Sequence, residues 1–161
     1  MGSAHGTGWL IRPDLMVTAG HNVYSWKKGP SGKIPGRARE IKAYAGYNGA
    51  ESINSPSVEF RVAKRVVTTS QWLDSASSKP RDFALVQLDQ PFTNTTPFQY
   101  IETPSQGDLE LGVVGYPADI VDEKNKERGG KMYELFEQTK FDIADNPDKM
   151  LAHYIDSEGG K

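Results

Sequence analysis

The feature that most constrains the fold is the shortness of the apolar runs in this sequence. Each run is soon interrupted by glycine, proline, asparagine or serine, and the 161 residues include 16 Gly and 10 Pro. Glycine and proline weaken helices and mark turns, which leaves little room for long uninterrupted helices. Short apolar runs between turn signals therefore predict a β-rich fold.

Two of these runs form the clearest predicted hairpin. Residues 8–11 and 15–19 lie on either side of a Pro-Asp turn signal at 13–14. The spacing of the runs that follow suits an antiparallel barrel better than alternating strands and helices. A helical turn is expected at 69–73, and the charged stretch 122–128 is expected to be a solvated loop or a short helix. Further strands are expected at residues 40–45, 60–67, 83–88, 111–115, 131–139 and 150–155.

Charge and composition exclude several classes of protein. The formal net charge is −2, and the 19 Lys and Arg residues are scattered among 21 Asp and Glu residues, so a nucleic-acid partner is not expected. No apolar run approaches the roughly 18 to 20 residues needed to cross a bilayer, and residues 1–5 lack the pattern of a secretory signal. The sequence therefore predicts a soluble protein without a membrane partner. The absence of cysteine excludes disulfides and cysteine-based metal sites.

Only three histidines, His5, His21 and His153, could act as a base or a metal ligand. Their segments are far apart and none shows metal-ligand spacing, so no metal and no cofactor is expected. His5 lies near the start of the chain and is expected to be exposed. His21 follows an apolar run, and the small residues Ala19 and Gly20 before it allow a tight turn that presents the imidazole. On its own, a histidine at a strand end is more often structural or merely exposed than catalytic.

A carboxylate could complete a site around His21. Asp82 stands at the mouth of a strand, residues 83–88, whose composition is typical of a buried strand. By itself it would more often be a turn residue or a charged gatekeeper residue that flanks a hydrophobic strand. A buried carboxylate beside a histidine, however, fixes the tautomer of the imidazole and stabilises the imidazolium that forms during acyl transfer. His21 and Asp82 are therefore the candidate catalytic pair.

These segments resemble, in the same order, motifs of the chymotrypsin-like serine endopeptidases. The matching motifs in the first half are Gly6-Thr7-Gly8-Trp9, Thr18-Ala19-Gly20-His21 and Asp82-Phe83-Ala84-Leu85. The second half is similar to the glutamyl-endopeptidase-like branch of that family. Its matching stretches are Val113-Val114-Gly115-Tyr116-Pro117-Ala118-Asp119 and Tyr154-Ile155-Asp156-Ser157-Glu158-Gly159-Gly160-Lys161. The resemblance spans nearly the whole chain.

The resemblance implies an all-β fold, a chymotrypsin-like double β-barrel with the active-site cleft between the two barrels. The first barrel is expected to be nearly complete and the second barrel to be truncated. Residues 6–92 are expected to form the first barrel, which carries His21 and Asp82. Residues 93–106 are expected to be the connector, and residues 107–161 a partial second barrel.

In that family the histidine is the general base, the aspartate orients it, and a Gly-x-Ser motif supplies the nucleophile. Matching Gly160 to the leading glycine of this motif gives its backbone amide a place in the oxyanion hole and puts the serine one residue beyond Lys161. Ser157 and His153 are expected to lie near the substrate pocket. Ser157 could equally be a turn serine, and a strand histidine such as His153 is more often packed by its neighbours.

The resemblance implies a trypsin-like serine endopeptidase acting on peptide or protein substrates, with cleavage after acidic residues, particularly Glu, implied by the branch. The chain as given lacks the nucleophile and is expected to be inactive alone. The alternative is a pseudoprotease, or an incomplete protease domain, that acts as a binding module. A partner chain or self-association could complete the second barrel. The resemblance implies a secreted protein, with a cytoplasmic one as the alternative.

Overall fold

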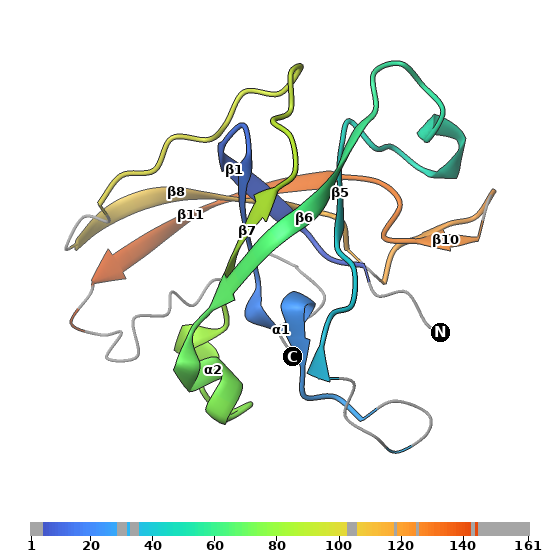
Figure 1. Cartoon of the computed structure of the whole chain (residues 1–161). Coiled ribbons are helices and arrows are strands. Elements are labelled where there is room, and N and C mark those ends of the chain that lie inside the picture. The colour runs from blue at the N-terminus through green and yellow to red at the C-terminus, as the bar shows by residue number, and fades with distance from the viewer. Residues whose placement is uncertain are drawn as a thin grey trace.

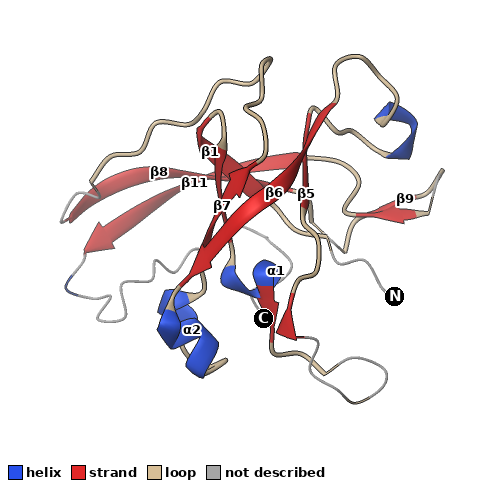
Figure 2. Ribbon diagram, in the orientation of Figure 1, coloured by secondary structure: helices blue, strands red, loops and turns tan. Residues whose placement is uncertain are grey.

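The computed structural model of the chain describes residues 5–28, 32, 36–102, 106–117, 119–124, 126–142 and 144. Antiparallel strands dominate this part of the chain, and its helices are short (Figure 1, Figure 2). None of the helices in these ranges is long and apolar enough to cross a membrane. The strands are β1 (Gly8–Arg12), β2 (Leu15–Thr18), β3 (Tyr24–Ser25), β4 (Gly36–Arg37), β5 (Lys42–Ala45), β6 (Glu59–Thr68), β7 (Ala84–Leu88), β8 (Gln106–Gly115), β9 (Val121–Asp122), β10 (Glu127–Arg128) and β11 (Tyr133–Asp142). The helices are α1 (Gly20–Val23), α2 (Ser70–Asp74) and the 3-10 turns η1 (Ala50–Ser52) and η2 (Lys79–Arg81).

The larger sheet has five antiparallel strands in the order β1-β2-β7-β6-β5. Its longest strand, β6, pairs with two different neighbours. Residues 59–62 pair with β5, and residues 63–68 pair with β7. Figure 1 shows β6 running diagonally across its neighbours. Because a twisted strand exchanges one partner for the other along its length, the sheet curls into part of a barrel.

β8 and β11 form a separate two-stranded sheet. The two strands pair along their whole length, from Gln106 opposite Asp142 to Gly115 opposite Tyr133. In Figure 1 the two strands cross the view behind the five-stranded sheet, and the end where β8 begins and β11 finishes lies to the left. The remaining pairs, β3 with β4 and β9 with β10, are two residues long.

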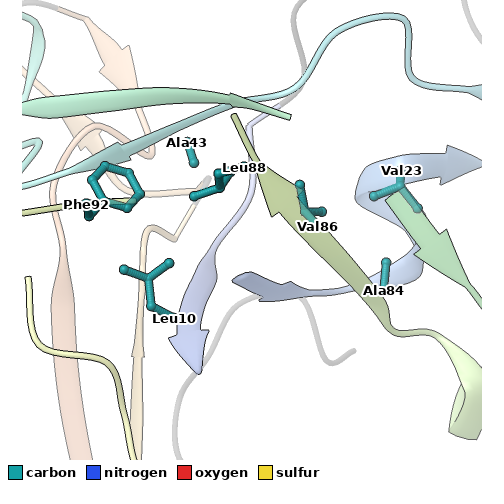
Figure 3. Packing of buried hydrophobic residues seen from close by; sticks show 7 residues of the cluster. All are labelled: Leu10, Val23, Ala43, Ala84, Val86, Leu88 and Phe92. Atoms are coloured by element: carbon teal, nitrogen blue, oxygen red, sulfur yellow. The ribbon is translucent and has the colours of Figure 1, made fainter. Parts of the chain in front are cut away.

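Seven buried apolar side chains from the five-stranded sheet and the segments beside it form the core (Figure 3). β7 contributes three of them, Ala84, Val86 and Leu88, because alternate residues of a strand face the same side. Burying a Val or Leu side chain completely stabilises the fold by about 1.5–3 kcal/mol, which makes β7 the centre of the stabilised region. The seven residues are Leu10, Val23, Ala43, Ala84, Val86, Leu88 and Phe92.

The structure confirms the first hairpin and the strands predicted around residues 40–45, 60–67, 83–88, 111–115 and 131–139. The prediction of a solvated loop at 122–128 holds for residues 123, 124 and 126, which are exposed turn residues, but the ends of the stretch are paired strands. β9 pairs with β10 across a turn in which Lys126 has a φ of 55°, in the left-handed region. The short helices α1 and α2 lie between the strands, and the strands of the described part of the chain agree with the predicted all-β fold.

The described residues do not test two further predictions. The strand predicted at 150–155 lies outside the described residues. The domain boundaries between residues 92 and 93 and between residues 106 and 107 stay predictions.

Candidate active site

The pairing of β2 with β7 brings His21 and Asp82 together. The two strands are antiparallel, and Thr18 at the end of β2 lies opposite Ala84 at the start of β7. The chain that leaves β2 and the chain that enters β7 therefore meet at the same end of the sheet. His21 comes three residues after Thr18, and Asp82 comes two residues before Ala84. His21 lies in the single turn of α1, where a short helix had not been predicted.

Both oxygens of the Asp82 carboxylate bind His21. Imidazole Nδ1 lies 2.8 Å from Oδ2, and the backbone N–H of His21 donates to Oδ1 at 2.7 Å. The Asp82 side chain is 22% exposed and the His21 side chain is 57% exposed. Because an ionised carboxylate only accepts hydrogen bonds, this contact selects the tautomer with the proton on Nδ1 and leaves Nε2 as the acceptor. The pair can therefore take up a proton at Nε2 and stabilise the resulting imidazolium.

Gly20 leaves the space that this contact needs. A Cβ atom at Gly20 would lie 2.9 Å from Oδ1 of Asp82 and 2.9 Å from Cδ1 of Trp72. Real Cβ atoms essentially never approach other atoms so closely, so a larger residue would displace either the carboxylate or the indole. The glycine before the histidine is thus required by packing on Asp82, in addition to the turn that the sequence predicted.

Two neighbouring threonines that the sequence analysis did not single out bond to the backbone on both sides of Asp82. The hydroxyl of Thr68 donates to the carbonyl of Phe83 at 2.7 Å, and that of Thr69 donates to the carbonyl of Arg81 at 2.9 Å. The position of Thr69 before a helical turn could have marked it as a helix cap. Its bond to Arg81 depends on tertiary structure, which no local pattern reveals.

Thr7 connects the site to the second half of the chain. The buried hydroxyl of Thr18 donates to the carbonyl of Thr7 at 2.7 Å. The hydroxyl of Thr7 accepts the N–H of Tyr116 at 2.9 Å. Asn22, the residue after His21, donates from its amide to the Thr18 hydroxyl at 2.9 Å. The Gly-Thr-Gly motif therefore joins the segment of the histidine to the Gly-Tyr-Pro segment.

A second set of polar contacts joins the two halves away from the histidine. The Tyr47 hydroxyl donates to the Glu127 carboxylate, which also accepts the N–H of Ala50 at 2.6 Å. The Tyr116 hydroxyl donates to the carbonyl of Tyr47 at 2.9 Å. Burial and the nearby Glu127 carboxylate raise the pKa of Tyr47 to about 12, so its hydroxyl remains a donor at neutral pH. The sequence analysis gave no role to the stretch 122–128, because this contact spans two distant segments.

The other predicted site residues are not brought into this arrangement by the described part of the chain. Gly160, Ser157 and His153 lie outside the described residues. His5 is exposed, as predicted. Within the described ranges, no group of three or more His, Asp or Glu residues could hold a metal ion.

Comparison with protein families agrees with the fold. The sequence matches the family model for trypsin over residues 2–147. The fold is the chymotrypsin-like double β-barrel, with one of its barrels partly formed. The chain belongs to the trypsin family.

A solved structure described as a Glu endopeptidase in complex with MPD is similar in fold. The two structures superpose with a TM-score of 0.63 at 22% sequence identity. The match covers 88% of this chain and 60% of that chain, so this chain spans about 60% of the length of the solved protein. A search of curated proteins found no match.

Proposed function

We propose that His21 and Asp82 are the general base and the orienting acid of a serine endopeptidase. The observation that carries this proposal is the double contact between them, at 2.8 Å to Nδ1 and 2.7 Å to the backbone N–H. Membership of the trypsin family supports it. One contact fixes the tautomer, and the other fixes the carboxylate relative to the helix that carries the imidazole.

In the proposed reaction, Nε2 of His21 removes the proton of a serine hydroxyl as the oxygen attacks the carbonyl carbon of the substrate. The carbonyl oxygen becomes an oxyanion, which backbone amides bind, and we propose that the amide of Gly160 is one of them. His21 then gives the proton to the leaving amine as the peptide bond breaks. Water repeats the sequence on the acyl-enzyme, and Asp82 stabilises the imidazolium at both stages.

The family motif, aligned on Gly160, places the serine directly after Lys161. We therefore propose that the 161 residues alone do not hydrolyse peptides. Removing the nucleophile from a serine protease lowers turnover by about a millionfold, because the base then has no hydroxyl to activate.

The substrate proposal is a peptide or protein cleaved after an acidic residue, with Glu preferred. The fold similarity to a Glu endopeptidase supports it. Ser157 and His153 are proposed to contribute to the pocket. We also propose that the protein is secreted, as members of this family commonly are.

A second candidate function is a binding module that uses the cleft expected between the two barrels. Exposed apolar side chains on the β8–β11 hairpin favour it, among them Leu135 at 50% and Phe136 at 61% exposure. A partner chain or a second copy could cover them. In that case the folded protein would bind peptides without cleaving them.

Labelling with a fluorophosphonate probe separates the two functions. The protein to use is the source gene product extended beyond Lys161 through the serine motif. An endopeptidase is labelled at that serine, and His21→Ala abolishes the labelling because the base is lost. His5→Ala is the matched control, since that exposed histidine has no proposed role. A folded, extended protein that remains unlabelled favours the binding module.

A further inference from the structure

Asp82 lies in a part of the backbone that the strand ladder does not hold. It follows η2 with φ −77° and ψ 65°, and the pairing of β7 begins only at Ala84. Its own N–H bonds to the carbonyl of Lys79 at 3.0 Å, which closes the preceding turn. Besides its two contacts with His21, the direction of the Asp82 side chain therefore depends on how the backbone around it is held.

The hydroxyls of Thr68 and Thr69 supply those contacts. They bond at 2.7 Å and 2.9 Å to the carbonyls of residues 83 and 81, one on each side of Asp82. Thr68 is the last residue of β6, which pairs with the core strand β7, so the anchor point is itself held by the sheet. The Thr69 bond opposes rotation of the peptide unit between Arg81 and Asp82, and the Thr68 bond holds the peptide unit that leads from Phe83 into β7.

Trp72 extends this support to the segment of the histidine. Its N–H donates to the hydroxyl of Thr69 at 3.1 Å, and its indole Nε1 donates to the carbonyl of Tyr24 at 3.1 Å. Its ring edge packs at Gly20, and only 5% of the residue is exposed. Gly20 and Tyr24 lie on either side of His21 along the chain. Through Trp72, helix α2 thus contacts residues near both Asp82 and His21.

From these contacts we propose that Thr68, Thr69 and Trp72 are positioning residues that hold Asp82 against His21. The inference rests on the proposed endopeptidase function and adds the residues that keep its base oriented. They act through the backbone around Asp82 and through α1. A misplacement of about 1 Å in a catalytic group can cost about a hundredfold in rate, so modest movement of the carboxylate is enough to be measured.

The test compares Thr69→Val with Thr69→Ser in the gene product extended through its serine motif. Valine keeps the shape and removes the hydroxyl, whereas serine keeps the hydroxyl. We expect Thr69→Val to lower kcat by about tenfold with KM changed by less than about twofold, and Thr69→Ser to restore most of kcat. The Nδ1–H proton resonance of His21 should move in the valine variant and return in the serine variant. Thr68→Val should show the same pattern.

Thr93→Val is the matched control. The hydroxyl of Thr93 bonds to Glu59 at 3.0 Å, in the loop after β7 rather than around Asp82. Thermal unfolding of all variants, including Trp72→Phe, shows whether a loss of rate comes from a loss of folded protein. An unmoved His21 resonance in Thr69→Val, or an equal loss of kcat in Thr93→Val at equal stability, overturns the proposal. If the unmodified protein has no turnover, the proposed function fails, while the resonance still tests the positioning.

Discussion

The two sheets of this molecule differ in what surrounds them. The five-stranded sheet encloses a core in which Val86 is completely buried and Leu88 is 2% exposed. The β8–β11 hairpin is longer, with ten residues in each strand, yet Leu135 and Phe136 on it are at least half exposed. Regular backbone pairing alone does not produce a packed core. The His21–Asp82 pair lies at the end of the packed sheet, where the surroundings can hold a carboxylate in place.

The largest effect is expected at the pair itself. Asp82→Asn keeps the size of the side chain but lets it donate a hydrogen bond to Nδ1, which favours the wrong imidazole tautomer. We expect kcat/KM of the extended protein to fall by about 10⁴-fold, as for the corresponding change in related triads. Steady-state hydrolysis of a peptide substrate measures it. A loss smaller than about tenfold would mean that Asp82 does not orient the base.

A Leu→Ala substitution in each sheet should show how much each sheet contributes to the free energy of unfolding. Leu88→Ala removes a core side chain and should lower the free energy of unfolding by about 2–5 kcal/mol. Leu135→Ala, at a half-exposed position, should change it by less than about 1 kcal/mol. Urea unfolding of both variants gives the two values. Equal losses would show that the hairpin is covered in solution, by a partner or by a second copy.

Alanine substitutions at Gly20 and Gly112 compare the effect of an added methyl group at two positions with different neighbours. In Gly20→Ala the new methyl group meets Asp82 and Trp72 at 2.9 Å, so we expect about 1–3 kcal/mol of destabilisation and about a tenfold loss of kcat. In Gly112→Ala the methyl group meets the ring of Phe136, an exposed side chain that can move. That variant should keep nearly full stability and rate. Equally active variants would contradict the packing argument for Gly20.

The smallest effect is expected at the contact between Tyr47 and Glu127. The pKa of Tyr47 is raised to about 12 in the folded protein, against 10 in the unfolded chain. The stabilisation is therefore present below pH 10 and is lost as the pH rises toward 12. Solvent screening limits it to about 1 kcal/mol or less. Unfolding measured between pH 9 and 12 should show a steeper loss for the unmodified chain than for Tyr47→Phe; parallel curves would refute the assignment.

Local patterns in the sequence were enough to predict the hairpin around Pro13-Asp14 and the buried strand after Asp82, whereas the pairing of His21 with Asp82 was expected from the resemblance of their motifs to a known family. Each of these depends on alternation, turn residues or a short motif. The supporting contacts of Thr68 and Thr69 were not predictable, because a hydroxyl that bonds to a carbonyl 12 or 15 residues away leaves no local pattern.

The contacts at the two ends of the stretch 122–128 were not predictable for a related reason. Its charged residues suggested a solvated segment, since charges usually face water. In the folded chain, Glu127 instead binds Tyr47, which lies 80 residues earlier. The side chain of Asp122 is 10% exposed and pairs with Lys131 at 3.1 Å. Only the tertiary fold supplies these partners.

The tautomer of His21 tests the central claim most directly. Nitrogen-15 NMR of histidine-labelled protein, at a pH where the imidazole is neutral, distinguishes a protonated Nδ1 from a protonated Nε2. The account predicts a proton on Nδ1, held by the Asp82 carboxylate. In Asp82→Asn the tautomer protonated on Nδ1 should no longer be the dominant one. A proton on Nε2, or a ring that exchanges freely between the two forms, would contradict it.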